Sequence, residues 1–518
     1  MRSPIRKTLS QHNVLRKLAN RELSRKGNRT FDRSNAQEKF RGFELCDGAL
    51  DTHDPKASHL RLSFLKKRSK ITEIVAAKDI IFALAASGVC VAFLRGPKEN
   101  ANQRLCFLNI SPCEVIRSLF FNKANNSIIT VSVYKEDNFS SLKCRSTPLE
   151  YIRRQDAAAG FSLFESESLR YPGFVEFDDV NGKVLTYSAA DKIYKVWDLK
   201  NYEHLYSIHD NNIYEIKISP GIMLLIYQKA PDGGHVPLKV LSIETGSVLQ
   251  SFKHQLHRSK KIDFIEQFNE KLLVKQENEP LQIIDIRTGT RTEVASSQFM
   301  TPSAFIFLYE NQLFLTFRRR SVAVWNFRGE KVTSFEDHTL WHPDCNTNNI
   351  YITSQQDLII SYCKHNPSES DDEDPDSNLG SINVSNILNG KSLARVRARP
   401  GNENDRAALE DVTALFYNEE RNEIYTGNND GRVHVWSNLH PPGSSKSASS
   451  SSKPAPAPVF QVTAGTSLEG SSAGGSSAGA AASAIASLAV PSLAAIAADG
   501  EALRSEARGR LTSSESGT

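Results

Sequence analysis

The sequence YTGNNDGRVHVW, from Tyr425 to Trp436, decides the fold class of this chain. Its first three residues would end one strand, the next four would form a turn, and the last five alternate polar and apolar residues as a half-buried strand does. Weaker copies occur at Tyr187–Asp198 (YSAADKIYKVWD) and Phe317–Asn326 (FRRRSVAVWN). Such recurrence at a spacing of about 40 to 50 residues is typical of a β-propeller, in which each repeat forms one small sheet.

Short alternating apolar runs separated by turn residues fill the chain from Leu60 to Asn438. They form eight units, at residues 70–110, 115–151, 174–208, 213–252, 262–295, 303–335, 349–398 and 412–436. The pattern therefore predicts an all-β, closed propeller of eight blades. Seven blades is the alternative, because the second unit is poorly formed and its fourth strand is expected only near Tyr151.

The eighth unit lacks a fourth strand of its own. The spare alternating run LRLSFL (Leu60–Leu65) precedes the first unit, and we expect it to pair beside Arg432–Trp436. Such pairing would join the chain ends and remove exposed sheet edges. Glycines recur at the expected turn between the third and fourth strands, at Gly246, Gly289 and Gly390, where a positive φ is needed.

Charge and composition divide the chain of 518 residues into three parts. Residues 1–58 form a basic arm, expected to be disordered or to carry a short helix, since residues 1–41 hold twelve Lys or Arg against three Asp or Glu. Residues 59–439 form the propeller. Residues 440–518 are rich in Ser, Ala, Gly and Pro and are expected to be disordered.

The localisation expected from the sequence is nuclear, cytoplasmic or both, and not secreted. No apolar run follows the N-terminal charges as it would in a secretion signal, and the seven cysteines lack regular spacing. The stretch Ala480–Ala498 is too weakly apolar for a membrane span, so no membrane partner is expected.

Residues 60–438 resemble the WD-repeat (transducin-like) propeller family, including plant WD-repeat-like proteins of undefined activity. The resemblance implies that Trp197, Trp325 and Trp436 are structural, together with Asp198, Thr426 and Asp430. Expected hydroxyl, carboxylate and indole sets are Ser188, Asp191 and Trp197 in the third unit and Thr426, Asp430 and Trp436 in the eighth. Neither unit has a clear Gly-His pair before its first strand, so packing must hold most blades.

The function expected from these patterns is that of a non-catalytic scaffold that presents loops to other proteins. The sequence shows no phosphate-binding glycine loop, no nucleophile elbow and no paired His-Glu metal motif, so neither an enzyme nor a cofactor is predicted. The candidate partner-binding residues are Arg318, Arg319, Arg320, His338, Trp341 and His342.

Two further motifs suggest other roles, one as a substrate receptor of a cullin-type ubiquitin ligase and one as a site of phosphorylation. The Trp197-Asp198-Leu199-Lys200 sequence approaches the Trp-Asp-x-Arg element with which some WD-repeat proteins dock on cullin ubiquitin ligases, but Lys replaces the bidentate Arg. The acidic insertion NPSESDDEDPDSN at residues 366–378 offers Ser368 and Ser370 as phosphorylation sites, because acidic residues follow both.

Residues of zinc-ligand type also gather, at His338, His342, Cys345, Cys363 and His365. Their spacing fits no standard finger, so no metal site is predicted.

Basic clusters at Arg16-Lys17, Arg25-Lys26 and Lys66–Lys70 (KKRSK) indicate nuclear import or contact with nucleic acid. A nuclear RNA- or chromatin-associated adaptor is therefore a second alternative function. No RNA-binding motif with interleaved aromatic residues accompanies these clusters, so they predict only non-specific electrostatic binding.

Overall fold

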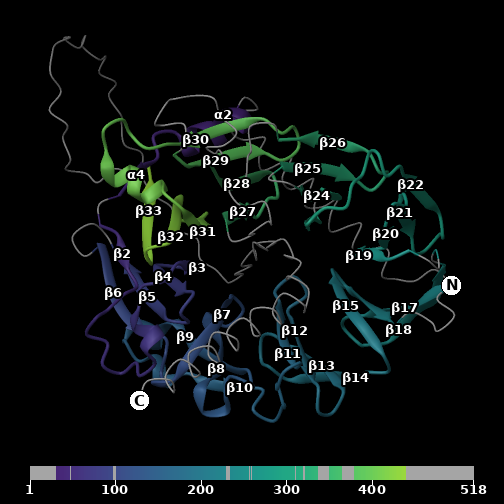
Figure 1. The fold of residues 1–518 in the computed structure, drawn as a ribbon, viewed down its shortest axis with the longest axis horizontal. Helices are drawn as coiled ribbons and strands as arrows, with labels where there is room; N and C mark the ends of the chain where they lie inside the picture. Colours follow the sequence, from purple (N-terminus) through teal and green to yellow (C-terminus); the bar gives the residue numbers. More distant parts are fainter. Residues whose placement is uncertain are drawn as a thin grey trace, which may run out of the picture.

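The computed structural model describes most of the chain between residues 31 and 438. The described residues are 31–46, 48–96, 101–228, 234–255, 257, 260–309, 311–318, 321–335, 349–364 and 379–438. Eight sheets stand around a common centre in Figure 1, which confirms the predicted eight-bladed propeller. No helix in this part of the chain is long and apolar enough to cross a bilayer. The terminal regions predicted to be disordered lie largely outside the described residues.

Each of the first four blades is an antiparallel sheet of four strands in sequence order, with the first strand innermost. Blade 1 contains β3 (Ile71–Ala77), β4 (Ile80–Ala85), β5 (Cys90–Arg95) and β6 (Ala101–Phe107). Blade 2 contains β7 (Glu114–Asn122), β8 (Ser127–Tyr134), β9 (Lys143–Pro148) and β10 (Phe161–Leu163). Blade 3 contains β11 (Phe174–Asp178), β12 (Lys183–Ser188), β13 (Ile193–Asp198) and β14 (His204–His209). Blade 4 contains β15 (Ile213–Ser219), β16 (Ile222–Tyr227), β17 (His235–Ser242) and β18 (Val248–Gln255).

The other four blades repeat this order, and the last one also receives strands from the N-terminal region. Blade 5 contains β19 (Ile262–Phe268), β20 (Lys271–Gln276), β21 (Leu281–Asp285) and β22 (Arg291–Val294). Blade 6 contains β23 (Ala304–Leu308), β24 (Leu313–Arg318), β25 (Ser321–Asn326) and β26 (Lys331–Ser334). Blade 7 contains β27 (Ile350–Ile352), β28 (Leu358–Cys363), β29 (Ser381–Asn386) and β30 (Ser392–Val396). Blade 8 contains β31 (Val412–Asn418), β32 (Glu423–Asn428), β33 (Arg432–Ser437), β1 (Glu44–Leu45) and β2 (Leu50–Asp51).

Short helices lie between or against the blades. The α-helices are α2 (Phe31–Phe40), α3 (Leu149–Arg153) and α4 (Glu403–Leu409), and the 3₁₀ helices are η2 (Ser63–Lys66), η4 (Lys135–Asp137) and η5 (Ala157–Ala159). Helix α2 lies beside β30 at the outer edge of blade 7 (Figure 1). It leads to Phe40, whose ring lies 5.3 Å from that of Tyr417 in blade 8.

Buried apolar side chains form one core between every pair of neighbouring blades. The alternation of each strand produces this arrangement, because successive side chains point to opposite faces of a sheet and so reach the two neighbours. In β19, for example, Ile265 packs toward blade 4 while Phe268 packs toward blade 6. Middle strands such as β28 are buried throughout, which explains their nearly continuous apolar sequences.

The ring is closed by β1 and β2, which both pair with β33 in antiparallel register. The expectation that Leu60–Leu65 forms the closing strand is wrong. Part of that run is the 3₁₀ helix η2. Three leucines of the run, Leu60, Leu62 and Leu65, are buried in the core between blades 8 and 1. Its alternation therefore reflects burial in a connecting segment and not strand pairing. The range expected to be an arm, residues 1–58, thus supplies α2, β1 and β2.

The fourth strand of blade 2 was also expected in the wrong place. Tyr151 lies in α3, and the strand that completes the sheet is β10. The three glycines predicted at the turns between third and fourth strands do adopt positive φ values, +68° at Gly246, +70° at Gly289 and +66° at Gly390. Those predictions are confirmed.

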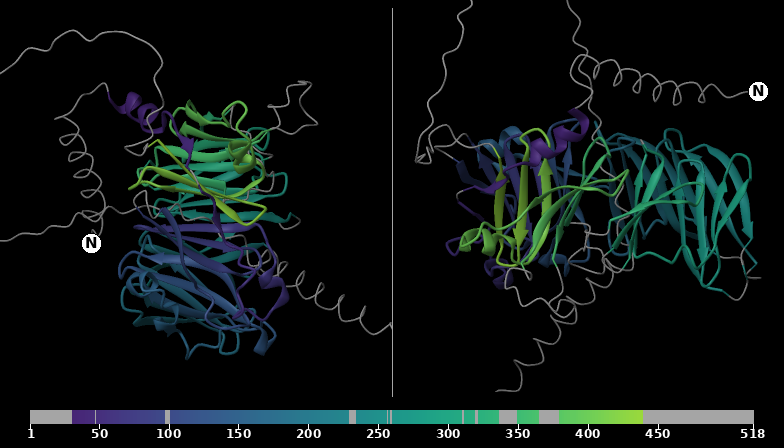
Figure 2. Two further views of the ribbon diagram at one scale, coloured as in Figure 1. Left: turned by 90° about the vertical axis from the view of Figure 1, so that its left-hand side faces the viewer. Right: turned by 90° about the horizontal axis from the view of Figure 1, so that it is seen from above.

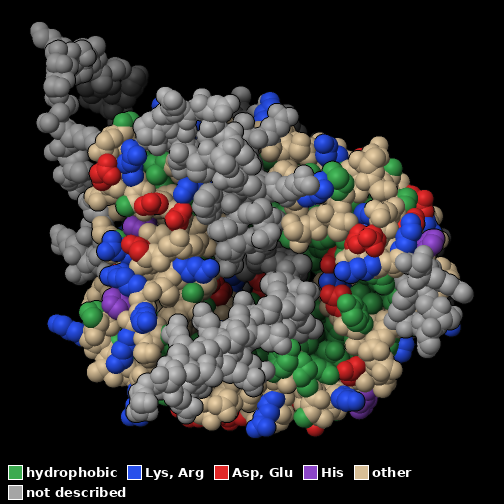
Figure 3. All heavy atoms as spheres, viewed as in Figure 1, with side chains coloured by type: hydrophobic (Ala, Val, Ile, Leu, Met, Phe, Trp, Pro, Cys, Tyr) green, Lys and Arg blue, Asp and Glu red, His purple; other side chains and the backbone are tan. Residues whose placement is uncertain are grey.

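The side views in Figure 2 show strands running across the thickness of the ring, so that all connections lie on two opposite faces. We call one of them the linker face. It carries the connections between blades and the turns between the second and third strands of each blade, and it faces the viewer in Figures 1 and 3. The opposite, hairpin face carries the other turns.

Candidate interaction site at the ring closure

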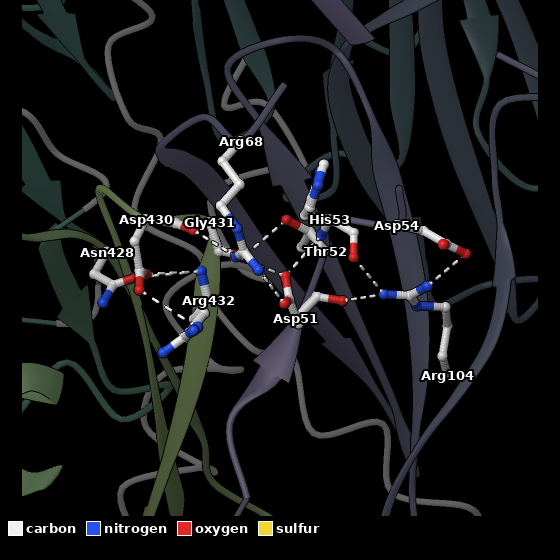
Figure 4. A network of polar contacts seen from close by, with 10 residues as sticks. All are labelled: Asp51, Thr52, His53, Asp54, Arg68, Arg104, Asn428, Asp430, Gly431 and Arg432. Carbon is white, nitrogen blue, oxygen red and sulfur yellow. Dashed lines mark hydrogen bonds and ion pairs between the residues drawn. The ribbon is translucent and has the colours of Figure 1, made fainter. Parts of the chain in front are cut away.

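The segment that follows β2 is tied to blade 8 by a group of polar contacts on the linker face (Figure 4). Arg68, just after η2, makes two hydrogen bonds to the carboxylate of Asp51, at 3.0 and 2.6 Å. The same guanidinium donates to the carbonyl oxygen of Asp430 at 3.2 Å. This one side chain therefore links the closing strand β2 to the β32–β33 turn, in the planar geometry that Arg favours.

Two hydrogen bonds from Thr52 to Gly431 complete this link. The Thr52 hydroxyl donates to the carbonyl oxygen of Gly431 at 2.7 Å, and its N–H donates to the same atom at 3.2 Å. Gly431 has φ +76°, and a Cβ atom there would lie 2.9 Å from the carbonyl oxygen of Ser69. Only glycine fits this turn without strain. Gly431, in the Asn-Asp-Gly sequence of the β32–β33 turn, therefore allows the segment after β2 to lie against this turn.

Blade 1 holds the other side of the closing segment. Arg104 in β6 donates to the carbonyl oxygens of Asp51 at 2.6 Å and His53 at 3.0 Å, and pairs with the Asp54 carboxylate at 2.9 Å. Partial burial acts to raise the pKa of Asp51, but hydrogen bonds from Arg68 and from the His53 N–H outweigh it and lower the pKa overall. The lowered pKa keeps Asp51 ionised beside Arg68 at neutral pH, and Asp54 pairs with Arg104.

The sequence-predicted contact residues lie mostly outside the described part of the chain. Arg318 ends β24, is half-buried, and accepts a hydrogen bond at its carbonyl oxygen from the Ser321 hydroxyl at 2.6 Å. The β24–β25 turn and the β28–β29 connection leave neighbouring blades at equivalent positions on the linker face. The predicted residues outside the described part are Arg319, Arg320, His338, Trp341, His342, Ser368 and Ser370.

Of the residues of zinc-ligand type, His338, His342, Cys345 and His365 also lie outside the described residues. Cys363 is buried at the end of β28. Among the residues that the structure describes, no group of three or more His, Cys, Asp or Glu is arranged to hold a metal ion.

Each of three blades contains a tryptophan whose indole N–H donates to a threonine hydroxyl on the neighbouring strand. The pairs are Trp197 with Thr186 at 2.9 Å, Trp325 with Thr316 at 3.0 Å and Trp436 with Thr426 at 2.9 Å. The partner of Trp197 is thus Thr186 and not Ser188, which instead donates to the Asp191 carboxylate at 2.7 Å.

The aspartates near these tryptophans act in turns. Asp198 accepts hydrogen bonds from the N–H groups of Lys200 at 2.8 Å and Asn201 at 3.2 Å, and so caps the β13–β14 turn on the hairpin face. Asp430 lies in the β32–β33 turn and pairs with Arg432 at 3.4 Å. The cullin-ligase hypothesis for Trp197–Lys200 gains no geometric support from these contacts and stays a prediction.

A separate polar group lies along the innermost strands. Lys217 of β15 bridges Glu215 at 2.7 Å and Glu266 of β19 at 2.9 Å. Burial raises the pKa of Glu176 in β11 to about 7, repulsion by Asp178 adds to this rise, and attraction by Lys217 opposes it. Burial likewise raises the pKa of Glu73 in β3 to about 7. Sequence reasoning missed these residues, because a carboxylate in an alternating strand is normally expected to face solvent.

Comparisons with known proteins give a family but no activity. Residues 28–436 match the model of a family described as Domain of unknown function (DUF7899). The sequence matches no curated protein.

The chain also matches several solved structures, each at low sequence identity. The designed protein Ika8 is 20% identical with a TM-score of 0.42, and the alignment covers 71% of this chain and 96% of that chain. BamB from Moraxella catarrhalis is 13% identical with a TM-score of 0.36, covering 77% and 98%. The C-terminal WD40 domain of Sif2 is 12% identical with a TM-score of 0.42, covering 72% and 98%.

Proposed function

The chain belongs to the family described as Domain of unknown function (DUF7899), and we propose that it is a non-catalytic scaffold that binds other proteins through its linker face. The closed ring is the observation that supports this proposal. Every blade shares a buried core with both neighbours, including blades 8 and 1 at the closure. A rigid support of this kind can hold variable connecting segments in fixed relative positions, which is what a binding surface requires.

Blades 6 and 7 carry the predicted contacts. The connections from Phe335 to Asn349 and from Lys364 to Leu379 start and end on the linker face, between described strands. They contain His338, Trp341 and His342 in the first case and the acidic insertion in the second. Trp341 is the residue on which we place most weight, since tryptophan is strongly enriched among residues that dominate protein interfaces.

Quantitative affinity purification of the full chain from native tissue, followed by mass spectrometry, tests the proposal. The test variant combines Arg318→Ala with Trp341→Ala. The control variant combines Arg328→Ala with Lys391→Ala, which lie in exposed hairpin-face turns of the same two blades. We expect a set of proteins that is lost from the test variant and kept by the control. If both variants retain every partner of the unchanged protein, blades 6 and 7 of the linker face are not the binding surface.

A further inference from the structure

The segment from Thr52 to Lys70, which we call the basic linker, is held rigidly although it contains almost no regular structure. Leu60, Leu62 and Leu65 are buried in the core between blades 8 and 1. The intervening Arg61 donates its N–H to the carbonyl oxygen of Pro112 at 2.9 Å, and η2 is fixed by the Leu65 N–H bonding to the Leu62 carbonyl at 3.1 Å. The residues between the anchors therefore point outward from a fixed backbone.

Those outward residues are strongly cationic. The acids Asp51 and Asp54 are already paired with Arg68 and Arg104. Figure 3 shows Lys and Arg side chains gathered on the linker face where blades 8 and 1 meet. The exposed cations of the linker that form no ion pair with another described residue are Lys56, Arg61, Lys66, Lys67 and Lys70.

An aromatic ring is exposed among these cations. Phe64 is 39% exposed and lies in η2, between Arg61 and Lys66. His59, also exposed, packs against Phe107 of β6 with its ring tilted by 59°, at a centroid distance of 5.0 Å. The linker thus combines point charges with flat ring surfaces, and neither ring is needed to fill the core.

We propose that the basic linker binds single-stranded nucleic acid, with Phe64 stacking on a base and Lys66 and Lys67 contacting the flanking phosphates. Stacking platforms within a cationic groove are the general means by which proteins bind single strands without sequence preference. An acidic protein segment is the less suitable partner. Lysines and arginines pair with carboxylates as well as with phosphates, so charge alone does not separate the two partners. The exposed ring of Phe64 does, because a nucleobase offers a flat π surface for stacking that a segment rich in Asp and Glu lacks.

The test is fluorescence anisotropy of the full chain with labelled oligonucleotides of fifteen uridines or fifteen thymidines, at several salt concentrations. We expect Phe64→Ala to weaken binding about tenfold with an unchanged salt dependence, since base stacking is largely uncharged. Phe64→Tyr should restore the affinity. Lys66→Ala combined with Lys67→Ala should weaken binding and reduce the slope of log K against log salt by about 1.4, for two single-strand phosphate contacts.

Several outcomes would overturn the proposal. The N-terminal arm is cationic and present in every variant, so the control must also lose two positive charges. The control variant is Arg328→Ala with Lys391→Ala on the hairpin face. If it lost as much affinity as Lys66→Ala with Lys67→Ala, the binding would be non-specific attraction. Undiminished binding by Phe64→Ala, or equally tight binding of a duplex of the same length, would exclude stacking. Binding of labelled polyglutamate in preference to both single strands would assign the surface to acidic proteins. The RNA and DNA probes show which strand type is preferred.

Discussion

Replacing Leu50 by alanine should weaken the ring at its closure. Leu50 is 1% exposed, lies opposite Val433 in the β2–β33 pair, and belongs to the core between blades 8 and 1. Loss of a fully buried leucine side chain to alanine costs about 3 kcal/mol of unfolding free energy, because the transfer of apolar groups is lost and a cavity remains. Phe64 in η2 is the control, since its ring is 39% exposed and its loss should cost only about 1 kcal/mol.

Urea unfolding followed by tryptophan fluorescence measures both changes, and hydrogen exchange locates them. Leu50→Ala should lower the unfolding free energy by about 3 kcal/mol and speed exchange of the β33 amides. Phe64→Ala should cost much less and leave the exchange of these amides unchanged. If both variants lost the same stability, or if the β33 amides exchanged at the same rate in Leu50→Ala as in the unchanged protein, the assignment of β2 as a closing strand would be refuted.

Three further substitutions test other parts of the ring. Since the pKa of Glu73 is raised from 4.5 to about 7, the folded state binds the Glu73 proton more tightly than the unfolded state does and loses stability as pH rises through this window. At about 1.4 kcal/mol per pKa unit, Glu73→Gln should raise the unfolding free energy by about 3 kcal/mol at pH 8 and by almost nothing at pH 4, as measured by urea unfolding. Gly246→Ala should lower the melting temperature more than Gly289→Ala, because both have positive φ but only the first would bring a Cβ within 2.5 Å of the Tyr206 ring; equal shifts would contradict this contact. Trp436→Phe should lower the unfolding free energy by about 2 kcal/mol, because the buried hydroxyl of Thr426 loses its hydrogen-bond donor. An unchanged melting temperature would show that this hydrogen bond contributes nothing to stability.

The alternation of apolar and polar residues predicted the number of blades, because the two faces of each sheet pack against the two neighbouring blades. This pattern did not predict the shortest strands and helices. The closing strands β1 and β2 contain two residues each, too few for any period to appear. Near Tyr151 the buried residues Leu149 and Ile152 are three apart, which is a helical spacing, and the sequence offered only this weak sign of α3.

The candidate surface was predictable only in part. The KKRSK cluster is visible in the sequence, but strict alternation would place Leu60, Leu62 and Phe64 on one buried face. The 3₁₀ turn of η2 shifts the register, so that Leu65 is buried and Phe64 is exposed. The pairing of Arg68 with Asp51 could not be foreseen either, because it depends on which segment closes the ring.

Disulfide trapping tests the closure of the ring most directly. Asp51 and Arg432 are Cα partners in adjacent antiparallel strands, a separation that a disulfide can span. With Asp51→Cys and Arg432→Cys combined, mild oxidation should form a cross-link that peptide mass spectrometry detects, while Ser63→Cys combined with Arg432→Cys should form none. A cross-link in the second variant and not in the first would show that Leu60–Leu65, and not β2, lies beside β33.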